Sequence, residues 1–275
     1  MVLFPNAKIN IGLFITEKRP DGFHNLETIF YPIGLCDILE LHKGEIGAGE
    51  CVFHTSGIPI DCEPEKNLVI KAYRLLAKEF DLPSVWVHLH KMIPFGAGLG
   101  GGSADAAYML KGINELFVLG LSDSCLEDYA SRLGSDCAFF IRNRPVYARG
   151  KGEIMSPIGL DLSGYSIVVV KPDGGVSTPE AYAGISPRAA TFDLRELPLC
   201  PVTGWKERIR NDFENTVGKK LPEVNRIKER LEEAGALYAS MTGSGSAVYA
   251  LFNRKIEIKE YFPDCFTWQS EQVGK

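Results

Sequence analysis

A glycine-rich segment that joins a strand-like run to an amphipathic, helix-like run constrains the fold of this chain more than any other feature. It runs from Pro94 to Ser103 as Pro-Phe-Gly-Ala-Gly-Leu-Gly-Gly-Gly-Ser and holds five glycines in seven positions. Glycine has no side chain to keep a ligand from the backbone, and its positive φ angles let several N–H groups converge on one anion. Ser103 is a favourable N-cap for the following helix, whose positive end would also attract an anion. The segment therefore predicts a loop that binds polyphosphate.

Three other kinds of loop could carry a similar pattern. A flexible linker is disfavoured, because linkers rarely lie tightly between a strand and an amphipathic helix. Gly96, Gly98 and Gly101 formally fit the dinucleotide motif GxGxxG. That fold needs a strand ending in Asp or Glu about 20 residues later, whereas residues 121–133 look helical. A Walker A loop is excluded because no lysine precedes Ser103. The phosphate loop of another kinase class remains.

Hydrophobic periodicity gives a coarse map of the chain. Alternation and short apolar runs predict strands over residues 7–13, 26–33, 38–42, 85–90, 165–170 and 247–252. Helical spacing predicts helices over residues 66–80, 103–117 and 123–133, and two more before the last strand, closed by Gly235. Strands and helices are mixed without strict alternation, so the predicted class is α+β. Clustered glycines and prolines at residues 150–164 predict an N-terminal domain of residues 1–155 and a C-terminal domain of residues 156–275.

Composition narrows the setting. A formal net charge of -5 argues against a general nucleic-acid or membrane-surface role, and no apolar run is long enough to span a bilayer. The seven cysteines are odd in number and scattered, which fits reduced thiols better than a disulfide framework or a zinc site. The first residues lack the features of a signal peptide. We expect a cytoplasmic protein with no nucleic acid, no membrane and no obligate protein partner.

Two glycine motifs carry a resemblance to a known superfamily. The Pro94-x3-Gly-Leu-Gly100 pattern resembles the ATP loop of the GHMP kinases, and Met241-Thr-Gly-Ser-Gly-Ser-Ala-Val248 is similar to their C-terminal glycine motif. Within that superfamily, Ala7-Lys8-Ile-Asn10 and Arg19-Pro-Asp-Gly-Phe-His24 resemble the opening of the diphosphocytidyl-methylerythritol kinases. Further matches are Pro64-x-x-Asn67-Leu68, Lys91-x-Ile-Pro94, Leu133-Gly-Ser-Asp136, Lys171-Pro172, Ser177-Thr178-Pro179 with Tyr182, and Asn211-Asp-Phe-Glu214. Phe23 departs from the tyrosine that is also common there, which keeps stacking but removes a hydroxyl.

The resemblance implies both a fold and an activity. It implies the two-domain GHMP kinase architecture, with an N-terminal domain like the second domain of ribosomal protein S5 and a ferredoxin-like C-terminal domain. With ATP and Mg²⁺, the chain would phosphorylate the 2-hydroxyl of a small-molecule substrate, a cytidine diphosphate-linked methylerythritol, in non-mevalonate isoprenoid precursor biosynthesis. The alternatives are another GHMP small-molecule kinase, of the homoserine or mevalonate type, and a catalytically silent ATP-binding regulator on the same fold.

The resemblance also implies site residues. Lys8 and Asp136 would be catalytic; from their local sequence alone, a solvated lysine and a turn aspartate would be favoured. Lys8 and Asn10 lie two residues apart and so share a strand face. Asn67, Lys91, Pro94, Gly96, Gly98, Leu99, Gly100, Gly101, Gly102, Ser103, Gly243 and Ser244 would bind ATP. Asn10, Phe23, His24, Thr178 and Tyr182 would bind the acceptor, with the base between Phe23 and Tyr182 and His24 at its edge. No metal ligand is identifiable, and His88 and His90 are interpreted as structural.

Overall fold

The computed structural model describes residues 1–60 and 63–270 as two compact units, each assembled from three separate stretches of chain. The first unit comprises Met1–Ala7, Gly34–Phe95 and Gly100–Arg144. The second comprises Lys8–Ile33, Gly96–Leu99 and the chain from Pro145 onward. The glycine loop therefore contributes residues to both units. The domain boundary expected at residue 155 stays a prediction.

The first unit is built on a four-stranded sheet. Its strands, in spatial order, are β1 (Val2–Leu3), β4 (Ile38–Ala48), β6 (Pro83–Lys91) and β5 (Cys51–Gly57). The pairs β1–β4 and β4–β6 are antiparallel, while β5 runs parallel to β6. Along β6, Val85, Val87 and Leu89 are buried whereas Trp86 and His88 are exposed, which confirms the alternation expected there.

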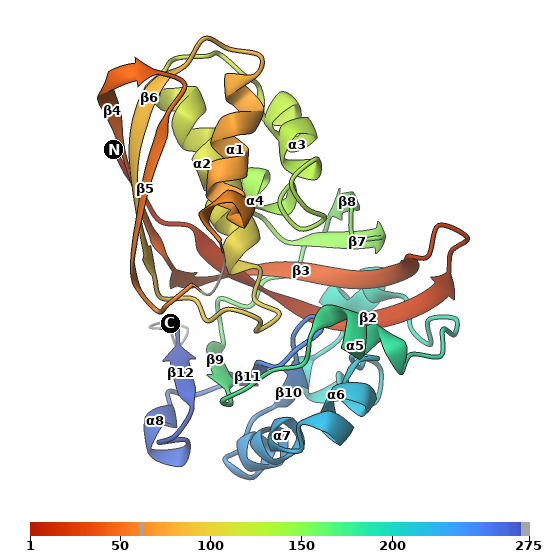
Figure 1. Ribbon diagram of the computed structural model, residues 1–275. Helices are drawn as coiled ribbons and strands as arrows, with labels where there is room; N and C mark the ends of the chain where they lie inside the picture. Colours follow the sequence, from red (N-terminus) through yellow and green to blue (C-terminus); the bar gives the residue numbers. More distant parts are fainter. Residues whose placement is uncertain (61–62, 271–275) are drawn as a thin grey trace. The chain divides into compact units, whose positions relative to one another are not determined.

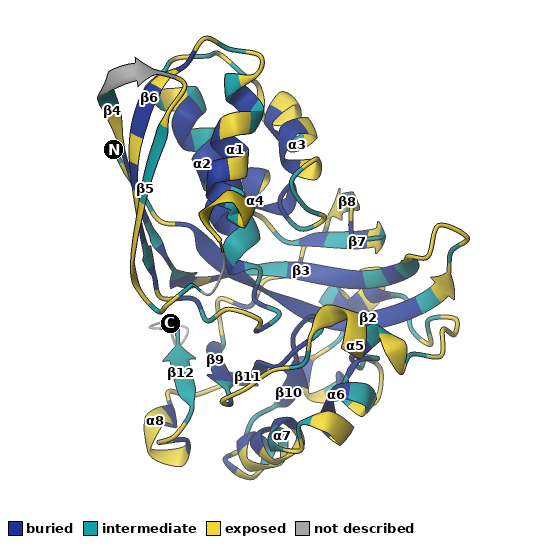
Figure 2. Cartoon of the chain, viewed as in Figure 1, coloured by how far each residue is buried: buried dark blue, intermediate teal, exposed yellow. Residues whose placement is uncertain are grey.

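Helices cover one face of this sheet (Figures 1 and 2). They are a 3-10 turn (Pro64–Lys66), α1 (Leu68–Ala77), α2 (Gly101–Leu116), α3 (Asp123–Ser131) and α4 (Phe139–Arg142). Figure 2 shows α1 and α2 with buried inner faces. On β6, His88 Nε2 and His90 Nδ1 lie 2.8 Å and 2.9 Å from Ser56 Oγ, which agrees with a structural role.

The second unit contains two sheets. One has the order β2 (Asn6–Lys18), β3 (His24–Cys36), β7 (Val146–Gly150) and β8 (Ile154–Pro157). The other has the order β10 (Tyr238–Met241), β11 (Val248–Phe252), β9 (Ser166–Lys171) and β12 (Phe266–Gln269), with every neighbouring pair antiparallel.

The second sheet has the ferredoxin-like topology. Between β9 and β10 lie α5 (Thr178–Ala183), two 3-10 segments (Leu194–Leu199 and Val202–Gly204), α6 (Glu214–Lys220) and α7 (Glu223–Glu233). The short helix α8 (Ile258–Tyr261) joins β11 to β12. Numbered along the chain, the strands stand in the order two, three, one, four. Apolar residues of α6 and α7, such as Val217 and Leu231, pack with Val168 and Ala250 of the sheet in one buried core.

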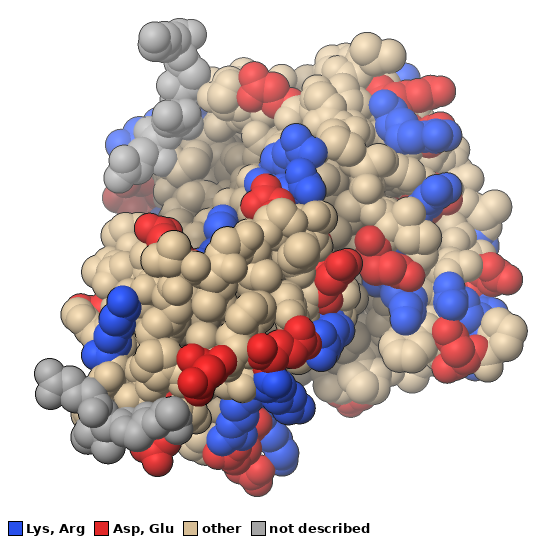
Figure 3. All heavy atoms as spheres, turned by 90° about the horizontal axis from the view of Figure 1, so that it is seen from above, with Lys and Arg blue, Asp and Glu red and all other residues tan. Residues whose placement is uncertain are grey.

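The predicted helices and strands are largely confirmed, since each predicted run overlaps a helix or strand of the expected type. The surface carries mixed charge: on the face in Figure 3, lysines and arginines stand among aspartates and glutamates. Within the part of the chain that the structure describes, no helix is both long and apolar enough to cross a membrane.

Candidate active site

The glycine loop between β6 and α2 has the backbone that its sequence predicts. Gly96, Gly98 and Gly100 have φ angles of +62°, +73° and +73°. They alternate with Ala97 and Leu99, which do not take positive φ. Alternation of right- and left-handed conformations turns successive N–H groups into an anion-binding concavity. The three positive φ angles fit an anion-binding loop of this kind.

Helix α2 begins earlier than expected. It starts at Gly101 with Gly100 as its N-cap, and no side chain caps it. The prediction that Ser103 is the N-cap was wrong, because the left-handed turn at Gly100 places the N-cap three residues earlier. Ser103 lies instead in the first turn, where backbone N–H groups are still without helical partners.

Two different physical reasons explain why glycine stands at positions 98 and 102 of the loop. A Cβ on Gly98 would lie 2.0 Å from the carbonyl oxygen of Thr242, so protein packing alone forbids a side chain there. Gly102 has no positive φ, and among the described residues no atom lies within 4 Å of a Cβ placed on it. Neither strain nor crowding explains the glycine at position 102. Close approach of a ligand to this backbone does, which fits a bound polyphosphate.

Lys8 is buried beside the loop. Its side chain comes from β2 and only 3% of the residue is exposed. The ammonium donates to Asn10 Oδ1 at 2.5 Å and to Gly98 O at 3.1 Å, and it lies 5.1 Å from the centroid of the Phe30 ring. The shared face of Lys8 and Asn10 is thereby confirmed. The Lys8 side chain is thereby fixed to the backbone of the loop, where it can interact with a bound anion.

The C-terminal glycine turn contacts the same loop. The Thr242 hydroxyl accepts a hydrogen bond from Asn10 N at 2.9 Å and donates to Gly98 O at 3.2 Å. A Cβ on Gly243, whose φ is +55°, would lie 3.0 Å from Gly98 O. Thr178 Oγ1 lies 3.1 Å from Ser244 Oγ, at the start of α5. The structure thus brings together candidate ATP and acceptor residues of the second unit.

Two of the three ring-bearing acceptor candidates, His24 of β3 and Tyr182 of α5, are in contact, whereas Phe23 contacts neither of them among the described ring contacts. The rings of His24 and Tyr182 stack with centroids 4.9 Å apart and planes inclined by 24°. Phe213 meets Tyr182 edge to face at 4.8 Å. Phe23 is 58% exposed, and the Lys151 ammonium lies 4.8 Å from its centroid. Burial and the nearby charge of Lys18 lower the pKa of His24, which favours the neutral imidazole.

In the first unit, Lys91 lies under the start of α2. Its ammonium forms ion pairs with Asp37 and, at 2.8 Å, with Asp105. All three residues are buried, and a Cβ on Gly101 would lie 3.3 Å from Lys91 Nζ. Asp37 Oδ1 also accepts from Met92 N at 2.6 Å. This buried triad supports the first turn of α2 from below.

The triad holds one ammonium against two carboxyl groups, which affects their titration. Burial raises the pKa of Asp105 to about 8, against the opposing charge of Lys91. Burial by itself would lower the pKa of Lys91, but attraction to Asp105 and Asp37 outweighs it and the pKa is raised. Asp105 Oδ1 is buried without a hydrogen-bond partner among the described atoms. The raised pKa of Asp105 favours the protonated form of this carboxyl at pH 7.

Two other candidates of the first unit have clear surroundings. Asn67 is the N-cap of α1, and its side chain accepts from Val69 N at 2.9 Å. Asp136 is half-buried and accepts from Ser135 Oγ at 3.4 Å. Burial raises the pKa of the adjacent Cys137 thiol to about 12, and a hydrogen bond with Ser103 partly offsets this. The segment that carries Asp136 thus contacts the first turn of α2.

Sequence reasoning missed four residues that organise these groups: Asp37, Asp105, Thr242 and Lys151. Asp37 and Asp105 each lie alone in apolar surroundings of the sequence, and such an isolated acid is rarely buried unless it is paired. That was the available signal for the triad. Thr242 lies inside the recognised glycine motif but carried no role. Among the described residues, no cluster of three or more His, Cys, Asp or Glu side chains is placed to hold a metal ion.

Comparisons with known proteins agree with this geometry. The model of the GHMP kinases N terminal domain matches residues 67–144, and that of the GHMP kinases C terminal matches residues 203–266. The 4-diphosphocytidyl-2-C-methyl-D-erythritol kinase of Bacteroides fragilis is 53% identical over 272 residues, 98% of this chain and 99% of that protein. The enzyme of the same name from Bacteroides thetaiotaomicron is 55% identical over 252 residues, 92% of each.

A solved structure extends the likeness to three dimensions. The crystal structure of a 4-(cytidine 5'-diphospho)-2C-methyl-D-erythritol kinase aligns with a TM-score of 0.84 and 29% identity, covering 98% of both chains. The matches to the two Bacteroides proteins cover 98% and 92% of the chain, so the matched ranges include both glycine motifs. The chain belongs to the 4-diphosphocytidyl-2-C-methyl-D-erythritol kinase family of the GHMP kinases.

Proposed function

We propose that this protein transfers the γ-phosphoryl group of ATP to the 2-hydroxyl of 4-diphosphocytidyl-2-C-methyl-D-erythritol, in non-mevalonate isoprenoid precursor biosynthesis. The observation that carries the proposal is the buried Lys8 ammonium, hydrogen-bonded to Gly98 O in a loop folded as an anion cradle. Family membership selects the acceptor among the GHMP substrates.

In the proposed reaction the acceptor oxygen forms a bond to the γ-phosphorus as the bond to the β,γ-bridging oxygen breaks, and ADP leaves. Asp136 orients the hydroxyl and receives its proton. A carboxylate with a pKa near 4 cannot remove that proton in advance. It has no need to, because in a loose transition state the proton leaves late. Lys8 offsets the negative charge on the transferring group from a fixed position.

We assign the polyphosphate to the loop residues Pro94, Gly96, Gly98, Leu99, Gly100, Gly101, Gly102 and Ser103, supported from the second unit by Gly243 and Ser244. Asn67 and Lys91 are assigned to the same nucleotide. Bound Mg²⁺ would neutralise charge on the β- and γ-phosphates. No protein ligand for it is assigned, since such ions are held largely by the phosphates themselves and by water.

We assign the cytosine of the acceptor to Phe23, His24 and Tyr182, and the hydroxyl-bearing part to Asn10 and Thr178. A neutral imidazole can both donate and accept, which suits the edge of a pyrimidine. Each stacked ring would contribute about 1–3 kcal/mol. We also place the reaction in the cytoplasm, because all six cysteines in the described part of the chain are unpaired thiols.

The test is turnover followed by phosphorus NMR. Purified protein with Mg-ATP and the cytidyl substrate should give a new phosphomonoester signal, while homoserine and mevalonate should not. Activity on either control instead would place the chain with another GHMP kinase type. Silence on all three would favour an ATP-binding regulator.

Isosteric variants test the assigned chemistry. Lys8→Met and Asp136→Asn should each lower kcat by at least about 100-fold, a loss typical of transition-state electrostatic and proton-transfer groups. Lys259→Met, at an exposed position of α8, and Asp128→Asn, on α3, are matched controls and should retain the wild-type rate. Near-normal rates for Lys8→Met or Asp136→Asn would refute that residue's role.

A further inference from the structure

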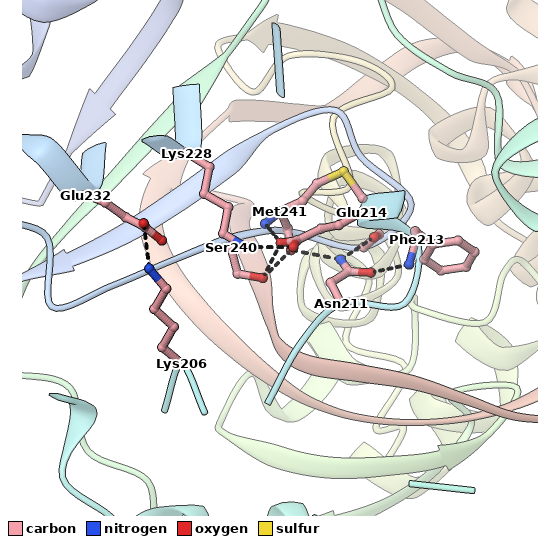
Figure 4. Close-up of polar contacts among 9 residues, drawn as sticks. Lys206, Asn211, Phe213, Glu214, Lys228, Glu232, Ser240 and Met241 are labelled. Carbon is pink, nitrogen blue, oxygen red and sulfur yellow. Dashed lines mark hydrogen bonds and ion pairs between the residues drawn. The ribbon is translucent and has the colours of Figure 1, made fainter. Parts of the chain in front are cut away.

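The side chain of Asn211 is a clamp on the C-terminal glycine turn. Asn211 is 4% exposed, and its amide nitrogen donates to Met241 O and to Gly243 O, both at 2.8 Å (Figure 4). Its Oδ1 accepts from Phe213 N at 3.0 Å. Both amide hydrogens and the oxygen therefore have partners. An amide has a single orientation that satisfies all three contacts, so the side chain is fixed.

The two clamped carbonyl groups flank one residue, Thr242. Its hydroxyl accepts from Asn10 N at 2.9 Å and donates to Gly98 O at 3.2 Å. The same Gly98 carbonyl accepts from the Lys8 ammonium at 3.1 Å, and Asn10 Oδ1 accepts from that ammonium at 2.5 Å. These two oxygens that accept from Lys8 thus belong to residues that Thr242 contacts.

We propose that Asn211 is a positioning residue that sets the place of the Lys8 ammonium through Thr242. Asn211 fixes the backbone on both sides of Thr242, Thr242 fixes Asn10 and Gly98, and these two fix Lys8. Every link lies within the second unit. The catalytic consequence rests on the proposed kinase activity, whereas the positioning itself does not.

Glu214 provides a matched comparison three residues away. Its carboxylate accepts from Met241 N at 2.8 Å, from Ser240 Oγ at 2.9 Å and from Lys228 Nζ at 2.7 Å (Figure 4). It therefore holds the end of β10, and in the described part of the chain it forms no hydrogen bond with residues 242–245. If Asn211 only supported this strand end, changes at Asn211 and Glu214 would have the same effects.

Hydrogen exchange tests the positioning without any substrate. In Asn211→Ala, the amides of Asn10 and Lys8 should exchange at least about tenfold faster than in wild type, because their acceptors are Thr242 Oγ1 and Leu99 O. Glu214→Gln should leave both rates unchanged. Equal acceleration in the two variants, or none in Asn211→Ala, would overturn the proposal. If Asn211→Ala does not fold, Asn211→Asp keeps the oxygen that accepts from Phe213 N but loses both amide donors, and it should give the same acceleration.

A double-mutant cycle tests the consequence for the reaction. Asn211→Ala and Thr242→Val should each lower kcat by about 10- to 100-fold with the KM for the acceptor within about threefold, as expected when a reacting group is misplaced. The double variant should be no slower than the slower single variant, because both changes break one chain of contacts. Additive losses would show that Asn211 acts by another route. An inactive wild type would instead refute the proposed function and leave the exchange result to decide the positioning.

Discussion

Alanine substitutions at two glycines of the glycine loop test whether its contact with Thr242 limits the size of a residue there. Gly96 and Gly98 both take positive φ, +62° and +73°. A Cβ on Gly98 would lie 2.0 Å from the carbonyl oxygen of Thr242 and 2.8 Å from its carbonyl carbon. A Cβ on Gly96 would have no described atom within 4 Å. Alanine at the two positions therefore imposes similar backbone strain but very different crowding.

The expected losses of stability differ accordingly. Holding alanine at a left-handed φ costs about 1–2 kcal/mol, which applies to Gly96→Ala and Gly98→Ala alike. At position 98 the obstructing atoms are backbone, so the loop and the turn must separate. That breaks the hydrogen bond from Thr242 Oγ1 at 3.2 Å and the charged one from Lys8 Nζ at 3.1 Å. Such bonds contribute about 1 and about 1.5–3 kcal/mol. We expect a loss of about 1–2 kcal/mol for Gly96→Ala and about 4 kcal/mol for Gly98→Ala.

Urea denaturation of both variants and the wild type measures these free energies of unfolding. Turnover of the folded variants adds a second readout, since Gly98→Ala should also displace Lys8 and lower kcat. If the two variants lie within about 0.5 kcal/mol of each other, the contact between loop and turn does not limit residue size at position 98. That result would also refute the explanation that the Gly98 carbonyl positions the Lys8 ammonium.

Three further variants follow from other parts of the structure. Asp105→Asn should stabilise the protein more at pH 8 than at pH 5. The carboxyl keeps its proton to about pH 8 in the folded state but loses it near pH 4 in the unfolded state, so its contribution to the free energy of unfolding falls as pH rises. An equal difference between variant and wild type at both pH values in urea denaturation would contradict this. Ser177→Ala removes the capping box of α5, the helix that carries Tyr182. In steady-state kinetics this should raise the KM for the acceptor several-fold with kcat little changed. An unchanged KM would place Tyr182 outside the binding site. Asn67→Ala should lower the stability of the folded protein by about 1 kcal/mol through loss of the α1 N-cap, whereas Asn67→Asp, which keeps the cap, should not. Thermal unfolding measures both variants, and equal losses would refute the capping role.

Local patterns predicted the parts of the fold that depend on near neighbours. The alternation of Val85, Val87 and Leu89 gave β6 because a half-buried strand must alternate. The pair Lys8 and Asn10 was placed on one strand face for the same reason, and the two side chains do meet. The glycines of the glycine loop predicted its positive φ angles, since few other residues tolerate them.

Such local patterns could not predict contacts between segments that lie far apart in the sequence. The buried state of Lys8 depends on Gly98, 90 residues away, and on the backbone around Thr242. The partner of Lys91 in the triad, Asp37, lies 54 residues upstream. β5 was not predicted because its half-exposed residues show little alternation. Periodicity reports burial on one element, whereas pairing between elements is decided by the tertiary fold.

The interleaved path of the chain also sets the order in which the protein can be completed on the ribosome. The first unit has all of its described segments once Arg144 has emerged, whereas Lys8–Ile33 belongs to a unit whose other main segment starts only at Pro145. Asn10 must wait for Thr242, 232 residues later. At synthesis rates of about 5–20 residues per second, this amounts to roughly 10–50 seconds. During that time the apolar side chains of β2 lack their final partners from the later segments of the second unit.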